Sequence, residues 1–201
     1  MKKILTLLLF NSILITGFSQ YDFLFERKSL SELRTYEDSI KSENIGFVKS
    51  NVATDYFPTA KEGVDYYPLS YHRTNDNFYP DLHVQYYYTE SDSILLSTVY
   101  DWNIMDYVKN LKTEGSKLEK ETKRSKEYLA KYESIKSDLI KKYGKPTSTE
   151  EEKNSEGYFY RLKWENESID ILVLLKFSKK LKSFGEMKFG SFNIRVKVDY
   201  K

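Results

Sequence analysis

Two segments near the end of the chain decide the fold: "YFYRLKWENESIDILVLLKF" (residues 158–177) and "FNIRVKVDY" (residues 192–200). In both segments large apolar side chains return at every second position, as they do on one face of a β-strand. In the last strand the alternation predicts an inward set, Phe192, Ile194, Val196, Val198 and Tyr200, and a wet set, Asn193, Arg195, Lys197 and Asp199. Such alternation is typical of an antiparallel sheet covered on one face only.

The first of these segments divides into two strands at the polar turn "NES" (residues 166–168). The strand after it places Val173 in the core, and the apolar residues Leu172 and Leu174 on its other face predict a central position in the sheet. Upstream, "HVQYYYTESDSILLSTVYDW" (residues 83–102) predicts another hairpin around the turn "ESDS". The sequence therefore predicts about five antiparallel strands.

A helical pattern runs from Ile104 to Tyr143, where Gly144 and Pro146 provide a helix stop. Between Lys112 and Glu127 the one large apolar residue is Leu118. A continuous helix of about forty residues would be about 60 Å long, more than a domain of this size spans. Two interpretations therefore stay open: one protruding helix, or two helices with a break near Gly115.

The N-terminal part of the chain supplies one more helix. Ser29 and Glu32 have the spacing of a capping box, and a thin apolar stripe follows. These features predict a helix from about Leu30 to Glu43, and Gly46 marks the point where the chain leaves it. Residues 46–81 contain three of the four prolines and read mostly as loop. The predicted fold is α+β: an antiparallel sheet of about five strands packed on one face by a long helix, with an additional N-terminal helix.

Two hairpin segments hint at an internal repeat. Residues 86–102, "YYYTESDSILLSTVYDW", and 162–177, "LKWENESIDILVLLKF", share the order aromatic strand, acidic and serine-containing turn, aliphatic strand. Many unrelated hairpins share this order, so we favour chance similarity. An internal duplication stays open as the alternative.

The first residues have the pattern of a secretory signal peptide. A positive start, "MKK", precedes an apolar stretch, and small residues at Gly17 and Ser19 predict cleavage before Gln20. The apolar stretch is shorter than the roughly 20 residues of a membrane span. We therefore expect a signal peptide at 1–19, a single domain at 20–201, no membrane span after cleavage, and a periplasmic or secreted location.

Composition excludes several kinds of chemistry. The chain has no cysteine, which rules out thiol catalysis, thiolate-bound zinc and iron–sulfur clusters. Without Lys2 and Lys3, thirty basic residues balance thirty acidic ones. Because a nucleic-acid binder carries a basic surface, we expect no nucleic acid as partner. We also expect no cofactor, since no phosphate-binding glycine loop is present.

Both histidines lie in the stretch "YPLSYHRTNDNFYPDLHVQYYY" (residues 67–88). A metal site there could use His72, Asp76, Asp81 and His83, which are ligand types for zinc or a harder ion. Their spacing matches none of the recognised metal motifs. We favour the alternative that Asn and Asp form turns and that the two imidazoles do not face each other.

Tyrosine is unusually abundant, with eighteen residues in the chain. Tyrosines at strand positions are expected to form the core. Four others, in the predicted loop, could present rings to a sugar or a peptide: Tyr66, Tyr67, Tyr71 and Tyr79.

The run "YGKP" (residues 143–146), Trp164 and "IDILVLL" (residues 169–175) resemble a layout found in small exported bacterial proteins of unknown function. In these proteins a helix ends in Tyr-Gly-x-Pro, and a Trp-bearing strand and an aliphatic strand follow. The resemblance covers roughly Leu129 to Leu175 and the signal peptide. It implies export, but it brings no catalytic residues.

These observations favour an exported, non-catalytic module that binds a peptide, glycan or protein partner. Its alternative is a hydrolase or metal-dependent enzyme that uses His72 or His83. No G-x-S-x-G or S-x-x-K motif supports a nucleophilic enzyme.

Overall fold

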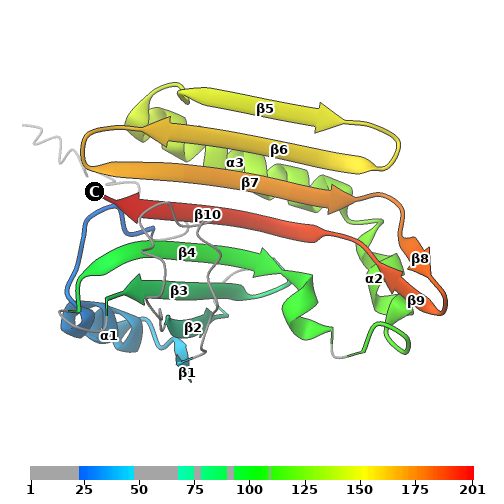
Figure 1. Ribbon diagram of the computed structural model, residues 1–201, viewed down its shortest axis with the longest axis horizontal. Helices are drawn as coiled ribbons and strands as arrows, with labels where there is room; N and C mark the ends of the chain where they lie inside the picture. Colours follow the sequence, from blue (N-terminus) through cyan, green and yellow to red (C-terminus); the bar gives the residue numbers. More distant parts are fainter. Residues whose placement is uncertain (1–22, 48–67, 75–77, 90–92, 109) are drawn as a thin grey trace, which may run out of the picture.

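The computed structural model describes residues 23–47, 68–74, 78–89, 93–108 and 110–201. Its main feature is an eight-stranded antiparallel sheet with the strand order β1-β2-β3-β4-β10-β7-β6-β5 (Figure 1). The elements, in chain order, are α1 (Leu30–Ser39), β1 (Glu43–Phe47), β2 (Leu69–Arg73), β3 (Leu82–Tyr88), β4 (Leu95–Asn103), a 3-10 turn η1 (Ile104–Tyr107), α2 (Gly115–Glu121), α3 (Ser125–Tyr143), β5 (Ser148–Lys153), β6 (Gly157–Glu165), β7 (Ile169–Ser178), β8 (Lys182–Phe184), β9 (Met187–Phe189) and β10 (Phe192–Tyr200).

The prediction of about five strands under one long helix is wrong. The five expected strands are β3, β4, β10, β7 and β6, which lie side by side at the centre of the sheet. In this sheet the strands that sequence reasoning missed are the outer ones, β1, β2 and β5, and it also missed the separate two-stranded β8–β9 ribbon. The sequence of β5, "STEEEK", is exposed at every position, so it carries no apolar alternation. Charged side chains on an edge strand also discourage pairing with another chain.

The helical region is divided, which settles the alternative left open for residues 104–143. η1, α2 and α3 are separate elements: one break directly precedes Gly115, where α2 begins, and a second lies at residues 122–124. α3 ends as expected, because Gly144 has a φ of +77°, a conformation that other residues rarely adopt. The N-terminal helix begins with the expected capping box but stops at Ser39, before the predicted Glu43, which instead begins β1.

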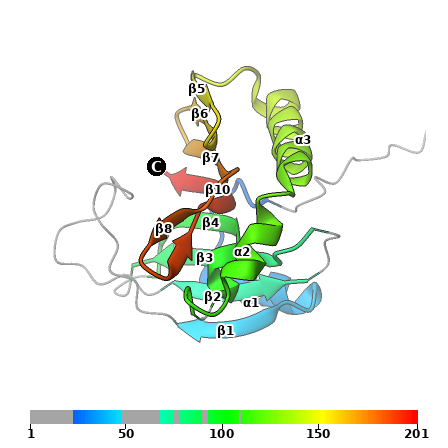
Figure 2. The same cartoon turned by 90° about the vertical axis from the view of Figure 1, so that its right-hand side faces the viewer.

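Both α1 and α3 cover the same face of the sheet, as the side view shows (Figure 2). The side chains of the central strands on this face form the core, and Val173 is fully buried as predicted. On the opposite face, here called the second face, the expectation of a wet surface is wrong in part. Lys197 is only 6% exposed and Asp101 only 4%. Two ion pairs on this face, Lys197–Asp199 and Arg195–Asp101, neutralise these buried charges.

The topology repeats. A helix is followed by four successive antiparallel strands twice, first as α1-β1-β2-β3-β4 and then as α3-β5-β6-β7-β10, and the two fourth strands pair with each other. This repeat matches β3 with β7 and β4 with β10. The hairpins compared in the sequence were β3–β4 and β6–β7, so that suggested correspondence is wrong by one strand.

Candidate functional site

The two histidines lie opposite each other on adjacent strands of the second face. His72 on β2 pairs with His83 on β3, and their ring centroids are 5.2 Å apart in an edge-to-face arrangement. The expectation that the two rings do not face each other is therefore wrong. Antiparallel pairing of β2 with β3 is what brings them together.

The histidine pair belongs to a row of polar side chains across the sheet. Glu43 Oε2 lies 3.9 Å from His72 Nδ1 at one end, and Asp101 stands opposite His83 on β4. Within the described residues no group of three or more His, Asp or Glu side chains is arranged to hold a metal. Asp76 lies outside the described residues, and Asp81 precedes β3 without joining such a group. The metal site thus stays a hypothesis.

The two candidate tyrosines among the described residues, Tyr71 and Tyr79, do not share a surface. Tyr66 and Tyr67 lie outside the described residues. Tyr71 is 1% exposed, and its ring packs edge-to-face against Tyr86 on the helix-covered face. Burial and the nearby carboxylate of Glu37 raise the pKa of Tyr71. Tyr79, in contrast, is 40% exposed. Of the two described candidates, only Tyr79 can offer its ring to a partner.

Tyr79 is held in place by Arg124, just before α3. Arg124 Nη1 donates a hydrogen bond to the Tyr79 carbonyl at 2.7 Å, and the guanidinium lies 6.0 Å from the Tyr79 ring. Glu121 and Glu127 form ion pairs with the same arginine. Lys117 Nζ of α2 lies 5.9 Å from the centroid of the Tyr79 ring. These contacts place Tyr79 beside α2.

Positive charge gathers at the same end of the molecule. Residues 176–190 contain five lysines and one glutamate, a net charge of +4, and residues 110–126 contain six basic and three acidic residues, a net charge of +3. The chain as a whole carries +2, so the remainder is net negative. Figure 1 shows α2 beside the β8–β9 ribbon, beyond the ends of β7 and β10. We call these two segments together the basic end.

One ion pair joins the two segments of the basic end. Lys188 on β9 forms an ion pair with Glu119 on α2 and thereby lowers the pKa of that carboxyl group. The aliphatic part of Lys188 also packs over Gly115, with its Cδ 3.4 Å from the position that a Cβ of residue 115 would occupy. The two segments are distant in the sequence, so this contact creates their common surface.

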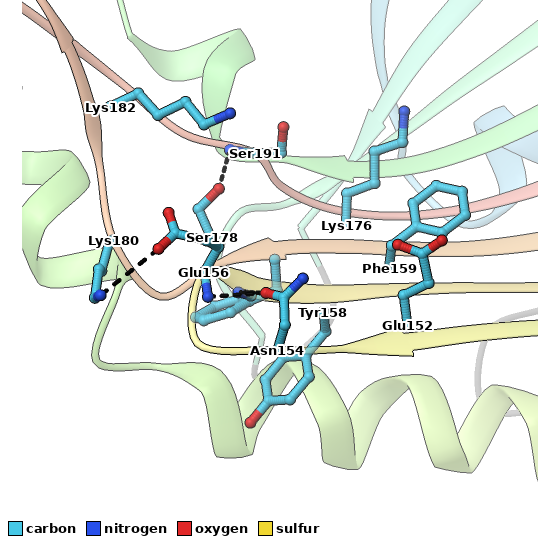
Figure 3. A pocket seen from close by; sticks show the side chains of 12 residues that line it. Glu152, Asn154, Glu156, Tyr158, Phe159, Lys176, Ser178, Lys180, Lys182 and Ser191 are labelled. Carbon is cyan, nitrogen blue, oxygen red and sulfur yellow. Dashed lines mark hydrogen bonds and ion pairs between the residues drawn. The ribbon is translucent and has the colours of Figure 1, made fainter.

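A pocket opens where the basic end meets the sheet (Figure 3). Its cavity volume is about 230 Å³, and its wall comes from the β5–β6 turn, the end of β7 and the residues that flank the ribbon. Asn154 Oδ1 shapes the turn by accepting hydrogen bonds from the backbone N–H groups of Glu156 and Gly157, at 2.8 and 3.0 Å. A Cβ on Gly157 would lie 2.0 Å from the Phe177 carbonyl oxygen, so this close strand contact requires glycine.

The pocket offers donors for an anion. Lys180 forms an ion pair with Glu156 at 3.6 Å, whereas neither Lys176 nor Lys182 forms an ion pair with a described carboxylate. Ser178 Oγ accepts from the Ser191 N–H at 2.9 Å and keeps its own proton for another acceptor. In Figure 3 the side chain of Lys182 extends toward Ser191. Ammonium and hydroxyl groups donate the hydrogen bonds that a carboxylate, sulfate or phosphate group accepts, and the acidic residues of the wall are Glu152 and Glu156.

Exposed aromatic side chains also concentrate here. The large hydrophobic residues with the most exposed side chains, among those described, are Ile45, Tyr79, Ile94, Ile140, Phe184 and Phe189. All three aromatic members of this set belong to the basic end or touch it. Sequence reasoning selected Tyr79 but missed the ribbon. The available signal was five lysines and three phenylalanines within residues 176–190, but the sequence alone did not reveal that residues 110–126 lie beside them.

No described helix is both long and apolar enough to cross a membrane.

Comparison of the chain with protein-family models, curated proteins and solved structures finds no match.

Proposed function

We propose that this chain is an exported, non-catalytic binding protein whose basic end recognises an acidic partner. The observation that carries the proposal is the coincidence of three features at one end of a nearly neutral chain. These are a net charge of +7 over residues 110–126 and 176–190, a pocket with two lysines free of ion pairs to described carboxylates, and three exposed aromatic rings. Positive potential attracts an acidic partner, and rings provide contact area at low entropic cost.

A binding titration with a soluble polyanion, such as dextran sulfate, tests this proposal. The double charge reversal Lys176→Glu and Lys182→Glu should greatly weaken binding, and rising salt should weaken binding of the wild type. The matched control is Lys145→Glu, an exposed lysine in the α3–β5 turn, which should bind within about twofold of wild type. Equal losses in both variants, or no binding by the wild type, would contradict the proposal.

Export is the second part of the proposal. It rests on the signal-peptide pattern of residues 1–19. The intact mass of protein recovered from the producing cell's envelope or medium should correspond to a chain that begins at Gln20, with a further loss of ammonia from cyclisation of that glutamine. Full-length protein retained in the membrane would overturn it.

The alternative function is a hydrolase or metal-dependent enzyme at the histidine pair. Its supporting observation is the 5.2 Å separation of the two imidazole centroids. Elemental analysis of the purified protein decides between the two. Stoichiometric zinc that disappears in the His72→Ala, His83→Ala double variant would favour the enzyme, whereas zinc-free protein would leave the binding proposal as the better one.

A further inference from the structure

The β8–β9 ribbon has two chemically different faces. Its register pairs Lys182 with Phe189, Ser183 with Lys188 and Phe184 with Met187. Because directly opposed residues share a face and successive residues alternate, one face carries Lys182, Phe184, Met187 and Phe189. The other face carries Ser183 and Lys188, and Lys188 contacts α2. The apolar face is therefore directed away from α2.

The apolar face of the ribbon is exposed at its tip. Phe184 is 73% exposed, the highest value among the large hydrophobic residues described, and Phe189 is 39% exposed. Gly185, with a φ of +58°, makes the tight turn that follows Phe184, so Phe184 belongs to the last strand pair before the tip. Exposure of a phenylalanine ring to water is unfavourable in proportion to its apolar area, so a site of this kind gains from being covered.

A lysine lies on this apolar face, and further lysines precede it in the chain. Lys182 shares the face with Phe184 and Phe189. Lys179 and Lys180 contact the β5–β6 turn, where they bind the Asn154 carbonyl and Glu156. The acidic residue of the tip, Glu186, is neutralised in part by Lys112, whose Nζ lies 3.6 Å away. Protein–protein interfaces are depleted in lysine and enriched in arginine, and residues 176–190 contain five lysines and no arginine. This composition favours a lipid surface over a protein partner.

We propose that the ribbon docks on a bilayer that contains anionic phospholipids, with Phe184 and Phe189 in the interfacial region and the ammonium group of Lys182 among the headgroups. This inference rests on the proposed function and names its acidic partner. Lysine side chains can extend their ammonium groups to the phosphates while their aliphatic parts follow the apolar ring into the interface. An anionic surface and a buried apolar group together provide the two signals that stable peripheral binding requires.

Labelled protein and vesicles of defined composition test the docking. The chain has no cysteine, so Met187→Cys, opposite Phe184 on the apolar face, gives a single attachment point for an environment-sensitive dye and keeps both rings. The label should shift its emission to the blue with vesicles of equal phosphatidylglycerol and phosphatidylcholine, and not with phosphatidylcholine alone. The matched control is Ile94→Cys, which is 41% exposed in the native chain and belongs to the β3–β4 turn. Its label should show no shift.

Sedimentation with the same vesicles then measures the contributions of ring and charge. Lys182→Glu should weaken binding by more than about fivefold, the effect expected for loss of one lysine near an anionic surface. Phe184→Ser should weaken it by about tenfold or more, while Ile94→Ser should not change it. Equal binding by wild type and Phe184→Ser would overturn the insertion of the ring. Circular dichroism spectra matching the wild type would show that each variant is folded.

The two proposals fail in different ways. If the protein binds dextran sulfate but not anionic vesicles, the lipid inference is overturned and the proposed function stands. If it binds neither, both are overturned. Binding to the vesicles that is lost in the Phe184→Ser variant supports both.

Discussion

Each half of the sheet carries one helix: α1 packs on the half formed by β1 to β4, and α3 packs on the half formed by β5, β6, β7 and β10. The interactions that attach the two helices to the sheet differ. α1 is ten residues long, and its two buried side chains are Leu33 and Glu37. α3 is nineteen residues long and buries an apolar and aromatic stripe with one lysine, namely Tyr128, Lys131, Tyr132, Ile135 and Leu139. The first helix therefore depends on a buried charge, and the second mainly on buried apolar area.

The charge on α1 is fully partnered. Arg73 on β2 contacts the Glu37 carboxylate with Nε at 3.1 Å and with Nη2 at 2.5 Å. The hydroxyl groups of Tyr86 and Ser42 donate to the same carboxylate. Burial raises the pKa of the Tyr86 hydroxyl well above its usual value, which keeps this group protonated as a donor. A short helix with one buried leucine can thus be fixed to a sheet when both oxygens of its buried carboxylate accept hydrogen bonds.

Aromatic contacts replace that network under α3. Tyr128 packs against Phe177 of β7 with ring centroids 5.1 Å apart, and Tyr132 packs against Tyr160 of β6 at 5.5 Å. Lys131 is also buried, with its Nζ 4.2 Å from the ring centroid of Trp102. Apolar area scales with helix length, whereas the ion pair does not. This comparison predicts that substitutions in the two halves change the unfolding free energy by different amounts. It also predicts that a second substitution can restore stability in the α1 half but not in the α3 half.

The largest effect should come from a charge in the core that both halves share. Val173→Asp places an unpartnered carboxylate at a fully buried position of β7 and should destabilise the fold by several kcal/mol, enough to unfold a typical domain. Chemical denaturation followed by circular dichroism measures this. Leu172→Asp is the matched control, because Leu172 is partly exposed on the second face and pairs with Lys163 and Lys197. Comparable losses from both changes would contradict the observed strand register.

The next largest effect should come from the ion pair under α1. Glu37→Leu leaves Arg73 as a buried, uncompensated charge and should cost about 3–5 kcal/mol of unfolding free energy. Arg73→Met should cost a similar amount for the converse reason. The double variant removes both charges and should recover much of the loss, which urea titration of all four proteins can measure. Additive losses in the double variant would contradict a coupled pair.

A cavity under α3 should have a smaller effect that cannot be rescued in this way. Leu139→Ala removes a side chain that is 2% exposed and should cost about 2–4 kcal/mol. The neighbouring residue Ile140 is 36% exposed, so Ile140→Ala should change the unfolding free energy by no more than about 0.5 kcal/mol. If the two alanine variants have the same stability, α3 does not pack through the face that contains Leu139.

Lys197 tests the second face of the sheet. Burial lowers the pKa of its ammonium group, and Asp199, with its Oδ2 at 2.8 Å, opposes that shift. Lys197→Glu would place two carboxylates side by side and should cost about 1–3 kcal/mol in the same urea titration. Lys163→Glu, on the same face of β6 and more exposed, is the comparison. A loss below about 0.5 kcal/mol at Lys197 would mean that this position is as wet as the sequence pattern suggests.

The smallest effect should be a pH dependence at the start of α1. The backbone N–H and the hydroxyl of Ser29 donate to Glu32 and lower the pKa of its carboxyl group. A carboxyl group with a lowered pKa in the folded state stabilises the fold above its unfolded pKa, and this contribution is lost as the pH falls through the folded value. Glu32→Gln should therefore be slightly less stable than the wild type at pH 7 and equal to it in strong acid. Denaturation midpoints across this range check the difference, and a constant gap at every pH would contradict it.

Local sequence patterns determined the parts of this protein in which one face of an element is buried. Period-two alternation identified the five central strands, the Ser29–Glu32 spacing identified the start of α1, and Gly144 followed by Pro146 identified the end of α3. These signals are local because a buried face requires apolar residues at the spacing of its own secondary structure. They failed for β5, whose sequence is exposed throughout and whose strand conformation comes from pairing with β6.

Contacts between distant residues decided the rest. Glu37 and Arg73 are 36 positions apart, so the sequence does not reveal the ion pair that fixes α1. Pairing of β2 with β3 places His72 opposite His83, and the contact of Lys188 with Glu119, 69 residues away, assembles the basic end. No local sequence pattern predicts these pairs, because each contact depends on strand order and register. The sequence by itself determined which residues must be buried or capped, whereas only the tertiary structure decided which charged and aromatic side chains meet.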